Sequence, residues 1–162
     1  MELRRIFTTN PANGFTLIEV VVVLGLFAAI LAATAFIGIQ SYRRYAFYTQ
    51  RNLAISALQK ARSLALSNIC LGPNCTGGQP HGVHFTSDGR CEIFQGLIFD
   101  PSDPANETVC QDRGVAFGPM DAVFLPLSAN LAAGPGTLNL ADALGHSALI
   151  TVGSFGQISW TN

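Results

Sequence analysis

The chain lacks proline between Pro11 and Pro73, and charged side chains are scarce throughout, at 12% of residues. From Val20 to Tyr42 there are 23 residues without a single Asp, Glu, Lys, Arg or His. A helix rises about 1.5 Å per residue, so about 20 apolar residues cross the ~30 Å hydrocarbon layer of a bilayer. The absence of charge and proline therefore predicts a membrane-spanning helix near the amino terminus.

Basic residues are also scarce after Ser63, where only Arg90 and Arg113 stand against eight acidic residues. By contrast, all five charged residues between Gln40 and Arg62 are positive. An acidic carboxyl-terminal part does not present the positive surface that nucleic-acid-binding proteins use, so a nucleic-acid partner is not expected. Charge alone leaves the membrane orientation open, because basic residues lie on both sides of the apolar run.

One acidic residue, Glu19, stands at the start of the apolar run, within the contiguous sequence Gly14-Phe15-Thr16-Leu17-Ile18-Glu19. A lone carboxylate inside a bilayer costs about 2.5–3.5 kcal/mol, so we expect it to have a partner. The preceding segment, residues 1–14, is polar and contains Arg4 and Arg5. Together these features resemble the processing site of type IV pilins and of the pseudopilins of type II secretion.

The resemblance implies that a prepilin peptidase cuts the leader after Gly14 and methylates the new amino terminus at Phe15. It also implies that Glu19 is the assembly residue. Cutting creates an α-amino group beside the apolar phase, and the Glu19 carboxylate of a neighbouring subunit can neutralise it when two helices stack with an axial offset.

Two other interpretations of the amino-terminal segment remain. An ordinary secretory signal would be cut at a small-residue site such as Ala33-Thr34-Ala35, and the mature chain would then begin at Phe36. A plain single-pass anchor would keep Met1. The position of Glu19 within the apolar part and the length of the run argue against the secretory signal.

Beyond the apolar run the helix should continue, because helical periodicity persists. Small and apolar residues recur on one face: Ala54, Leu58, Ala61 and Ala65, joined by Ala57, Leu64 and Ile69. Polar residues lie opposite: Ser56, Gln59, Lys60 and Ser63. We therefore predict one helix from Phe15 to Asn68 whose second half packs against a head.

A stretch rich in Gly, Pro, Asn and Cys, from Cys70 to Pro80, should end the helix. Strand-like runs follow at 81–85, 91–95 with an extension over 96–99, 114–117, 122–127, 137–140, 148–152 and 157–160. Asp88-Gly89 is a hairpin-turn sequence, and an acidic loop is expected from Asp100 to Asp112.

The predicted fold class is therefore α+β, with a long N-terminal helix, half in the membrane and half amphipathic, packed on a mostly antiparallel, β-rich C-terminal head. We divide the chain into a leader peptide (1–14), a transmembrane or filament-core helix (15–42), an amphipathic helix half (43–69) and a globular head (70–162).

All four cysteines, Cys70, Cys75, Cys91 and Cys110, lie beyond the apolar run. Four cysteines allow three pairings, and an even number in a small exported domain favours disulfides. The turn-forming residues between Cys70 and Cys75 favour the pairs Cys70–Cys75 and Cys91–Cys110. A zinc site is the alternative, although the wide separation of the last two cysteines does not suit it.

Candidate sites for chemistry are weak. The carboxylates of Asp100, Asp103 and Glu107 are candidate calcium ligands, but the glycine-centred spacing of an EF-hand is absent and a solvated loop explains them equally well. His81 and His84 are three apart and would face opposite sides of a strand. We therefore expect no catalytic residue, no cofactor and no enzymatic activity.

The helix around Ala61-Arg62 also resembles that of the GspH/FimT group of minor pseudopilins and minor pilins, whose head is a β-rich sandwich. This resemblance implies a subunit of a type II secretion pseudopilus or type IV pilus. Its partners would be other pilin or pseudopilin subunits, the prepilin peptidase, an assembly platform of the inner membrane and membrane lipid. The chain would cross the bacterial inner membrane once, with a periplasmic head.

An alternative function is a minor pilin whose head binds DNA or a secreted substrate. Members of this group that take up DNA carry a Gly-Arg pair in the C-terminal hairpin turn. The corresponding pair here is Gly156-Gln157, and no basic residue follows Arg113. DNA binding by this turn is therefore not expected.

Overall fold

The structure is a computed structural model that describes residues 14–71, 77–111 and 114–161. Residues up to Ser41 and residues from Tyr42 onward form two compact units. Helix α1 (Leu17–Leu66) contributes residues to both units. The second unit therefore holds the last part of α1 together with all the strands.

The first turn of α1 is capped by Thr16. Its side-chain Oγ1 accepts a hydrogen bond from the Glu19 amide at 3.3 Å, and its carbonyl accepts the first helical bond from the Val20 amide at 3.2 Å. A threonine at this position satisfies an amide that would otherwise lack a partner. The helix consequently begins at Leu17, two residues after the predicted start at Phe15.

The last turn of α1 ends in a left-handed residue, Asn68, whose φ is 53°. The Asn68 amide donates to the Ala65 carbonyl at 3.1 Å, and the Ile69 amide donates to the Leu64 carbonyl at 3.1 Å. These two bonds define a Schellman motif, and asparagine tolerates the left-handed conformation better than most residues. The helix thus ends at Leu66, before the predicted end at Asn68.

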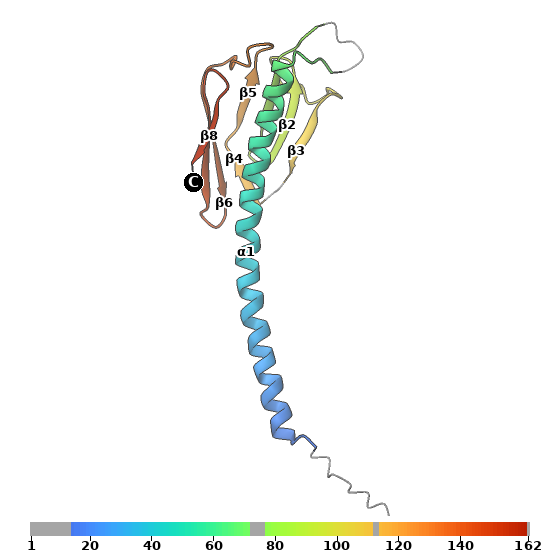
Figure 1. The fold of residues 1–162 in the computed structure, drawn as a ribbon, viewed down its shortest axis with the longest axis vertical. Coiled ribbons are helices and arrows are strands. Elements are labelled where there is room, and N and C mark those ends of the chain that lie inside the picture. The colour runs from blue at the N-terminus through green and yellow to red at the C-terminus, as the bar shows by residue number, and fades with distance from the viewer. Residues whose placement is uncertain (1–13, 72–76, 112–113, 162) are drawn as a thin grey trace, which may run out of the picture. The chain divides into compact units, whose positions relative to one another are not determined.

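Two four-stranded antiparallel sheets follow the helix, which confirms the α+β class (Figure 1). The first sheet has the order β3-β2-β1-β5 and contains β1 (His81–Phe85), β2 (Arg90–Gln95), β3 (Glu107–Gln111) and β5 (Met120–Phe124). The second has the order β4-β6-β7-β8 and contains β4 (Val115–Phe117), β6 (Gly136–Asp142), β7 (Ser147–Val152) and β8 (Ile158–Thr161).

The hydrophobic core is shared by α1 and both sheets, and the head part of α1 runs alongside them (Figure 1). The predicted helix stripe is confirmed, since Ala54, Leu58, Ala61 and Ala65 are fully buried. Their small side chains let the helix approach the strands closely, and a buried leucine such as Leu58 contributes about 1.5–3 kcal/mol. Ile69 was wrongly assigned to this stripe: it lies beyond the end of the helix and is 40% exposed.

The predicted extension of β2 over 96–99 is wrong. The strand stops at Gln95 because Gly96 turns the chain with a φ of 110°. The segment then folds over the sheet, where the Phe99 ring stacks on His84 at 4.1 Å and contacts Phe94 edge-on at 5.5 Å. Phe99 therefore packs on the sheet, whereas Leu97 and Ile98 are exposed.

The predicted acidic loop also contains a strand that the sequence did not indicate, β3. Its polar sequence Glu-Thr-Val-Cys-Gln lacks the alternation of a half-buried strand, and only Cys110 is buried. The strand predicted over 122–127 begins and ends earlier, as β5, and Leu127 lies beyond it with a φ of 63°.

Gly156 offers a test of the packing between loops at one end of the head. Its φ is 71°, and a Cβ added there would lie 2.3 Å from the Ala129 carbonyl oxygen. We expect Gly156→Ala to lower the free energy of unfolding of the detergent-solubilised chain by about 2–4 kcal/mol, from left-handed strain plus the backbone clash.

Gly145→Ala is the matched control, because Gly145 has a φ of 86° but no atom within 4 Å of the added Cβ. Its free energy of unfolding should fall only by the left-handed strain, about 1–2 kcal/mol. Denaturant unfolding of the two variants would contradict the observed packing if both lost the same stability.

Candidate processing and assembly site

The predicted cleavage site lies outside any helix. Gly14 and Phe15 precede α1 as non-helical backbone because Thr16 caps the helix behind them. The Phe15 side chain is 81% exposed, and no atom lies within 4 Å of the position that a Cβ on Gly14 would occupy. The peptide bond between these two residues is therefore non-helical and is not covered by the rest of the described chain. The predicted leader, apart from Gly14, lies outside the described residues.

Glu19 lies in the first turn of α1, three residues after the capping Thr16. Thr-x-x-Glu is the capping-box pattern, and an acidic residue near a helix amino terminus gains about 0.3–1 kcal/mol from the helix dipole. This local benefit is smaller than the ~2.5–3.5 kcal/mol cost of a carboxylate in lipid. The Glu19 side chain is exposed and forms no ion pair with any described residue.

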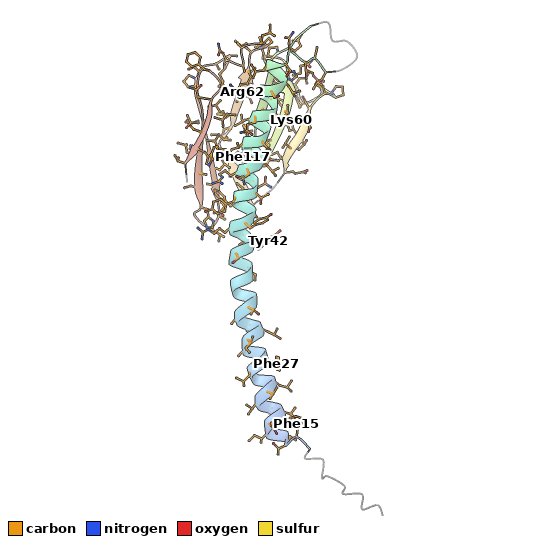
Figure 2. The ribbon with its side chains drawn as sticks, in the orientation of Figure 1. Phe15, Phe27, Tyr42, Lys60, Arg62 and Phe117 are labelled. Carbon is orange, nitrogen blue, oxygen red and sulfur yellow. A yellow bond between two sulfur atoms is a disulfide. The ribbon has the colours of Figure 1, made fainter. Side chains whose placement is uncertain are left out.

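Large apolar side chains of α1 after Glu19 are exposed in the described part of the chain. Large side chains such as Leu24, Phe27 and Leu31 are at least 60% exposed, and Phe15 and Phe27 project from their segment in Figure 2. Among the described residues, Leu17–Thr34 is the stretch of helix long and apolar enough to cross a membrane. The charge of Glu19 therefore lies at one end of a surface suited to lipid or to other helices.

Residues 9–35 match the family of the prokaryotic N-terminal methylation motif. The match covers the predicted cut and the first part of α1. The motif and the apolar helix together fit a type IV pilin-like protein, a class of structural subunits rather than enzymes. The motif implies processing by prepilin peptidase and assembly with other pilin subunits. Neither the curated proteins nor the solved structures gave a match to this chain.

The disulfide between Cys91 and Cys110 is confirmed, with Cα atoms 4.7 Å apart. It joins residues that lie opposite each other in β2 and β3, and both are fully buried. Closing a loop of this length contributes about 3 kcal/mol in the chain-entropy account. Cys70 is also disulfide-bonded, and Cys75, its predicted partner, lies outside the described residues.

The calcium hypothesis receives no support from the described residues, which contain no group of three acidic, histidine or cysteine side chains able to hold a metal. Asp100 instead accepts hydrogen bonds from the Ser102 hydroxyl and amide, at 2.7 and 2.9 Å, which lower the pKa of its carboxyl. The Asp103 carboxylate accepts a hydrogen bond from the Ala105 amide. The Glu107 carboxylate forms an ion pair with Lys60 of α1, with Oε2 and Nζ 2.5 Å apart.

The two histidines that the sequence placed on opposite faces of a strand have separate partners. His81 is fully buried, with Nε2 2.8 Å from the Ile69 carbonyl oxygen. The His84 ring contacts the Asp121 carboxylate at 2.5 Å. Each histidine therefore has a structural role, in agreement with the prediction that they do not form one site.

The hairpin turn between β7 and β8 is held by Gln157, whose side-chain oxygen accepts the Phe155 amide at 3.1 Å. The residue that stands in place of an arginine therefore stabilises the turn. A basic side chain that the sequence did not place at this turn is Arg62 of α1. Its Nε lies about 3.0 Å from the position that a Cβ on Gly156 would occupy. Figure 2 shows Arg62 far along α1 from Tyr42.

Proposed function

We infer that the chain is a non-enzymatic minor subunit of a pilus-like filament, held in the membrane by α1 until it is assembled. The observation that carries this inference is the position of Glu19. It is a carboxylate without a partner among the described residues, in the first turn of an exposed apolar helix directly after a methylation-type cleavage sequence. This arrangement suits a carboxylate that pairs with another subunit in lipid or in a filament core.

The mechanism follows from two charges that are each unfavourable alone. Removal of residues 1–14 would leave the Phe15 amine at the amino terminus of α1, where the helix dipole disfavours a positive charge. Glu19 of a neighbouring subunit would neutralise that amine when the helices stack in the apolar core. The free energy recovered by pairing favours assembly over a lone subunit in lipid.

We assign residues 15–42 to the transmembrane or filament-core helix, 43–69 to the amphipathic half and 70–162 to the head. In this proposal the chain crosses the bacterial inner membrane once, and its head is periplasmic, where the disulfides form readily. The amphipathic half and the β-rich head support a GspH/FimT-type minor subunit, in a type II secretion pseudopilus or a type IV pilus, that works with an inner-membrane assembly platform.

Co-purification tests the proposal. A tag on the head should recover, from gently solubilised membranes of the native cell, other chains that carry the same kind of amino-terminal motif, detected by mass spectrometry. Recovery of the tagged chain alone, from cells that contain assembled filaments, would contradict the proposal. The DNA-binding alternative predicts salt-dependent DNA capture by the same sample, which we do not expect from an acidic head with Gln157 in its hairpin turn.

A further inference from the structure

The head contains an open cavity of about 400 Å³ beside the part of α1 that begins at Tyr42. We call it the foot pocket. Tyr42, Arg43, Ala46 and Phe47 of α1 line one side, and the β6–β7 turn contributes Ala143 and Leu144. Its volume is at the lower end of the ~300–1,000 Å³ range of small-molecule sites. Most of the lining is apolar, so the pocket is suited to a ligand with both a charged and an apolar part.

The charge of the foot pocket is set mainly by Arg43, which is exposed and forms no ion pair with a described residue. Asp142 also lines the pocket, but its carboxylate is engaged by its own hairpin. Oδ1 accepts the Leu144 and His146 amides, each at 2.9 Å, and Oδ2 contacts His146 Nδ1 at 2.7 Å. Burial raises the pKa of Asp142, yet these hydrogen bonds hold it below its usual value.

The His146 ring packs against Phe47 at 5.7 Å, so the partner of the Asp142 carboxylate is itself held by a residue that lines the foot pocket. The available charge for a ligand is therefore the Arg43 guanidinium. Nearby Arg44 and Arg51 lie over the Tyr48 ring, at 5.8 and 5.0 Å, and add to a positive surface around this part of α1. These groups suit an anionic ligand, although the ionised Asp142 carboxylate in the lining offsets part of the positive charge.

Position along the chain identifies the source of the anion. Arg43 is the first charged residue after Glu19, so it marks the end of the apolar run. Exposed Tyr42 and Tyr45, at 72% and 69%, flank it. Tyrosine directly after a membrane span is typical of the headgroup layer of a bilayer, and an arginine near the end of a spanning helix extends its charge into that layer. A pocket lined by Tyr42 and Arg43 therefore meets lipid phosphates before any other anion.

We propose that the foot pocket binds one anionic phospholipid of the surrounding membrane, with the phosphate at Arg43 and the glycerol region against Ala46, Phe47 and Leu144. The proposal rests on the membrane anchoring inferred above. The bound lipid fixes the height of the head at the membrane surface before assembly and must leave when the subunit is extracted into a filament.

Native mass spectrometry of the full-length chain in detergent, titrated with phosphatidylglycerol or phosphatidylethanolamine, tests the proposal. The chain should retain one phosphatidylglycerol about fivefold better than phosphatidylethanolamine, as expected for one well-placed arginine. Ala46→Trp fills the pocket without changing charge and should lower this retention at least fivefold. Tyr45→Trp, on the same turn of α1 but outside the pocket, should stay within twofold of the unaltered chain.

Arg43→Gln is a second variant that keeps the test informative if Ala46→Trp misfolds. It should remove the preference for phosphatidylglycerol while the Cys91–Cys110 disulfide still forms. Equal retention of the two lipids, or equal behaviour of Ala46→Trp and Tyr45→Trp, would overturn the proposal in favour of a general surface charge effect. Displacement of the lipid by inorganic phosphate at the same concentration would also overturn it. Because binding is read on purified chain, it is independent of processing and filament assembly, which the co-purification above tests.

Discussion

Gly14→Val should leave residues 1–14 attached to the chain. The peptidase must bring the carbonyl of residue 14 close to its catalytic groups, and glycine leaves that approach open because it has no side chain. No atom of the described residues lies within 4 Å of a Cβ added at Gly14, so the substitution should not disturb the fold. Intact mass of the membrane-extracted protein should show the full leader in nearly all molecules and no added methyl group.

Gly25→Val is the matched control, since Gly25 also has no atom within 4 Å of an added Cβ but lies within α1. That variant should be processed like the unaltered chain. If Gly14→Val instead had the mass of a chain that begins at Phe15, the assignment of the cleavage site would be wrong.

Glu19→Val should be processed normally but should enter filaments at least tenfold less than the unaltered chain. The expected size follows from the ~2.5–3.5 kcal/mol that a carboxylate costs in lipid, which pairing with a neighbour's amine recovers. Losing that pairing also leaves the neighbour's amine unpaired. Quantitative mass spectrometry of sheared or solubilised filaments measures the incorporated fraction.

Thr16→Ala separates this role from helix capping. It removes the hydroxyl that accepts the Glu19 amide but keeps the carboxylate, and it should cost about 1 kcal/mol of local helix stability. Its incorporation should remain within about threefold of normal. If Thr16→Ala failed as severely as Glu19→Val, the capping interaction rather than intermolecular pairing would explain the defect.

Local patterns along the chain were enough to predict the helix and most strands. The buried stripe from Ala54 to Ala65 follows from helical spacing, and β1 was predicted with its observed bounds, because both depend on neighbours in sequence. The turn at Asp88-Gly89 also follows from local chemistry, since Gly89 adopts a φ of 84°. The cleavage and assembly residues were predicted for the same reason: their signal is a contiguous motif.

Features that depend on distant contacts could not be predicted in this way. Strand β3 forms where a polar segment pairs with β2, and hydrophobic alternation does not reveal this pairing. The Cys91–Cys110 bond that joins the two strands was predicted, but not the strand that it holds. The sequence predicted that Phe99 belongs to a strand, but its ring instead packs on the sheet, stacked on His84. The foot pocket likewise depends on a β6–β7 turn lying beside the beginning of the head's helix, a proximity that no sequence spacing encodes.

The most direct test of the account is the chemical identity of the mature amino terminus in the native cell. Peptide mass spectrometry should find a chain that starts at Phe15 with one methyl group on its α-amine. A chain that keeps Met1 would contradict it, because no new amine would form near Glu19. A chain that starts at Phe36 after an ordinary secretory cut would also contradict it, because Glu19 itself would have been removed.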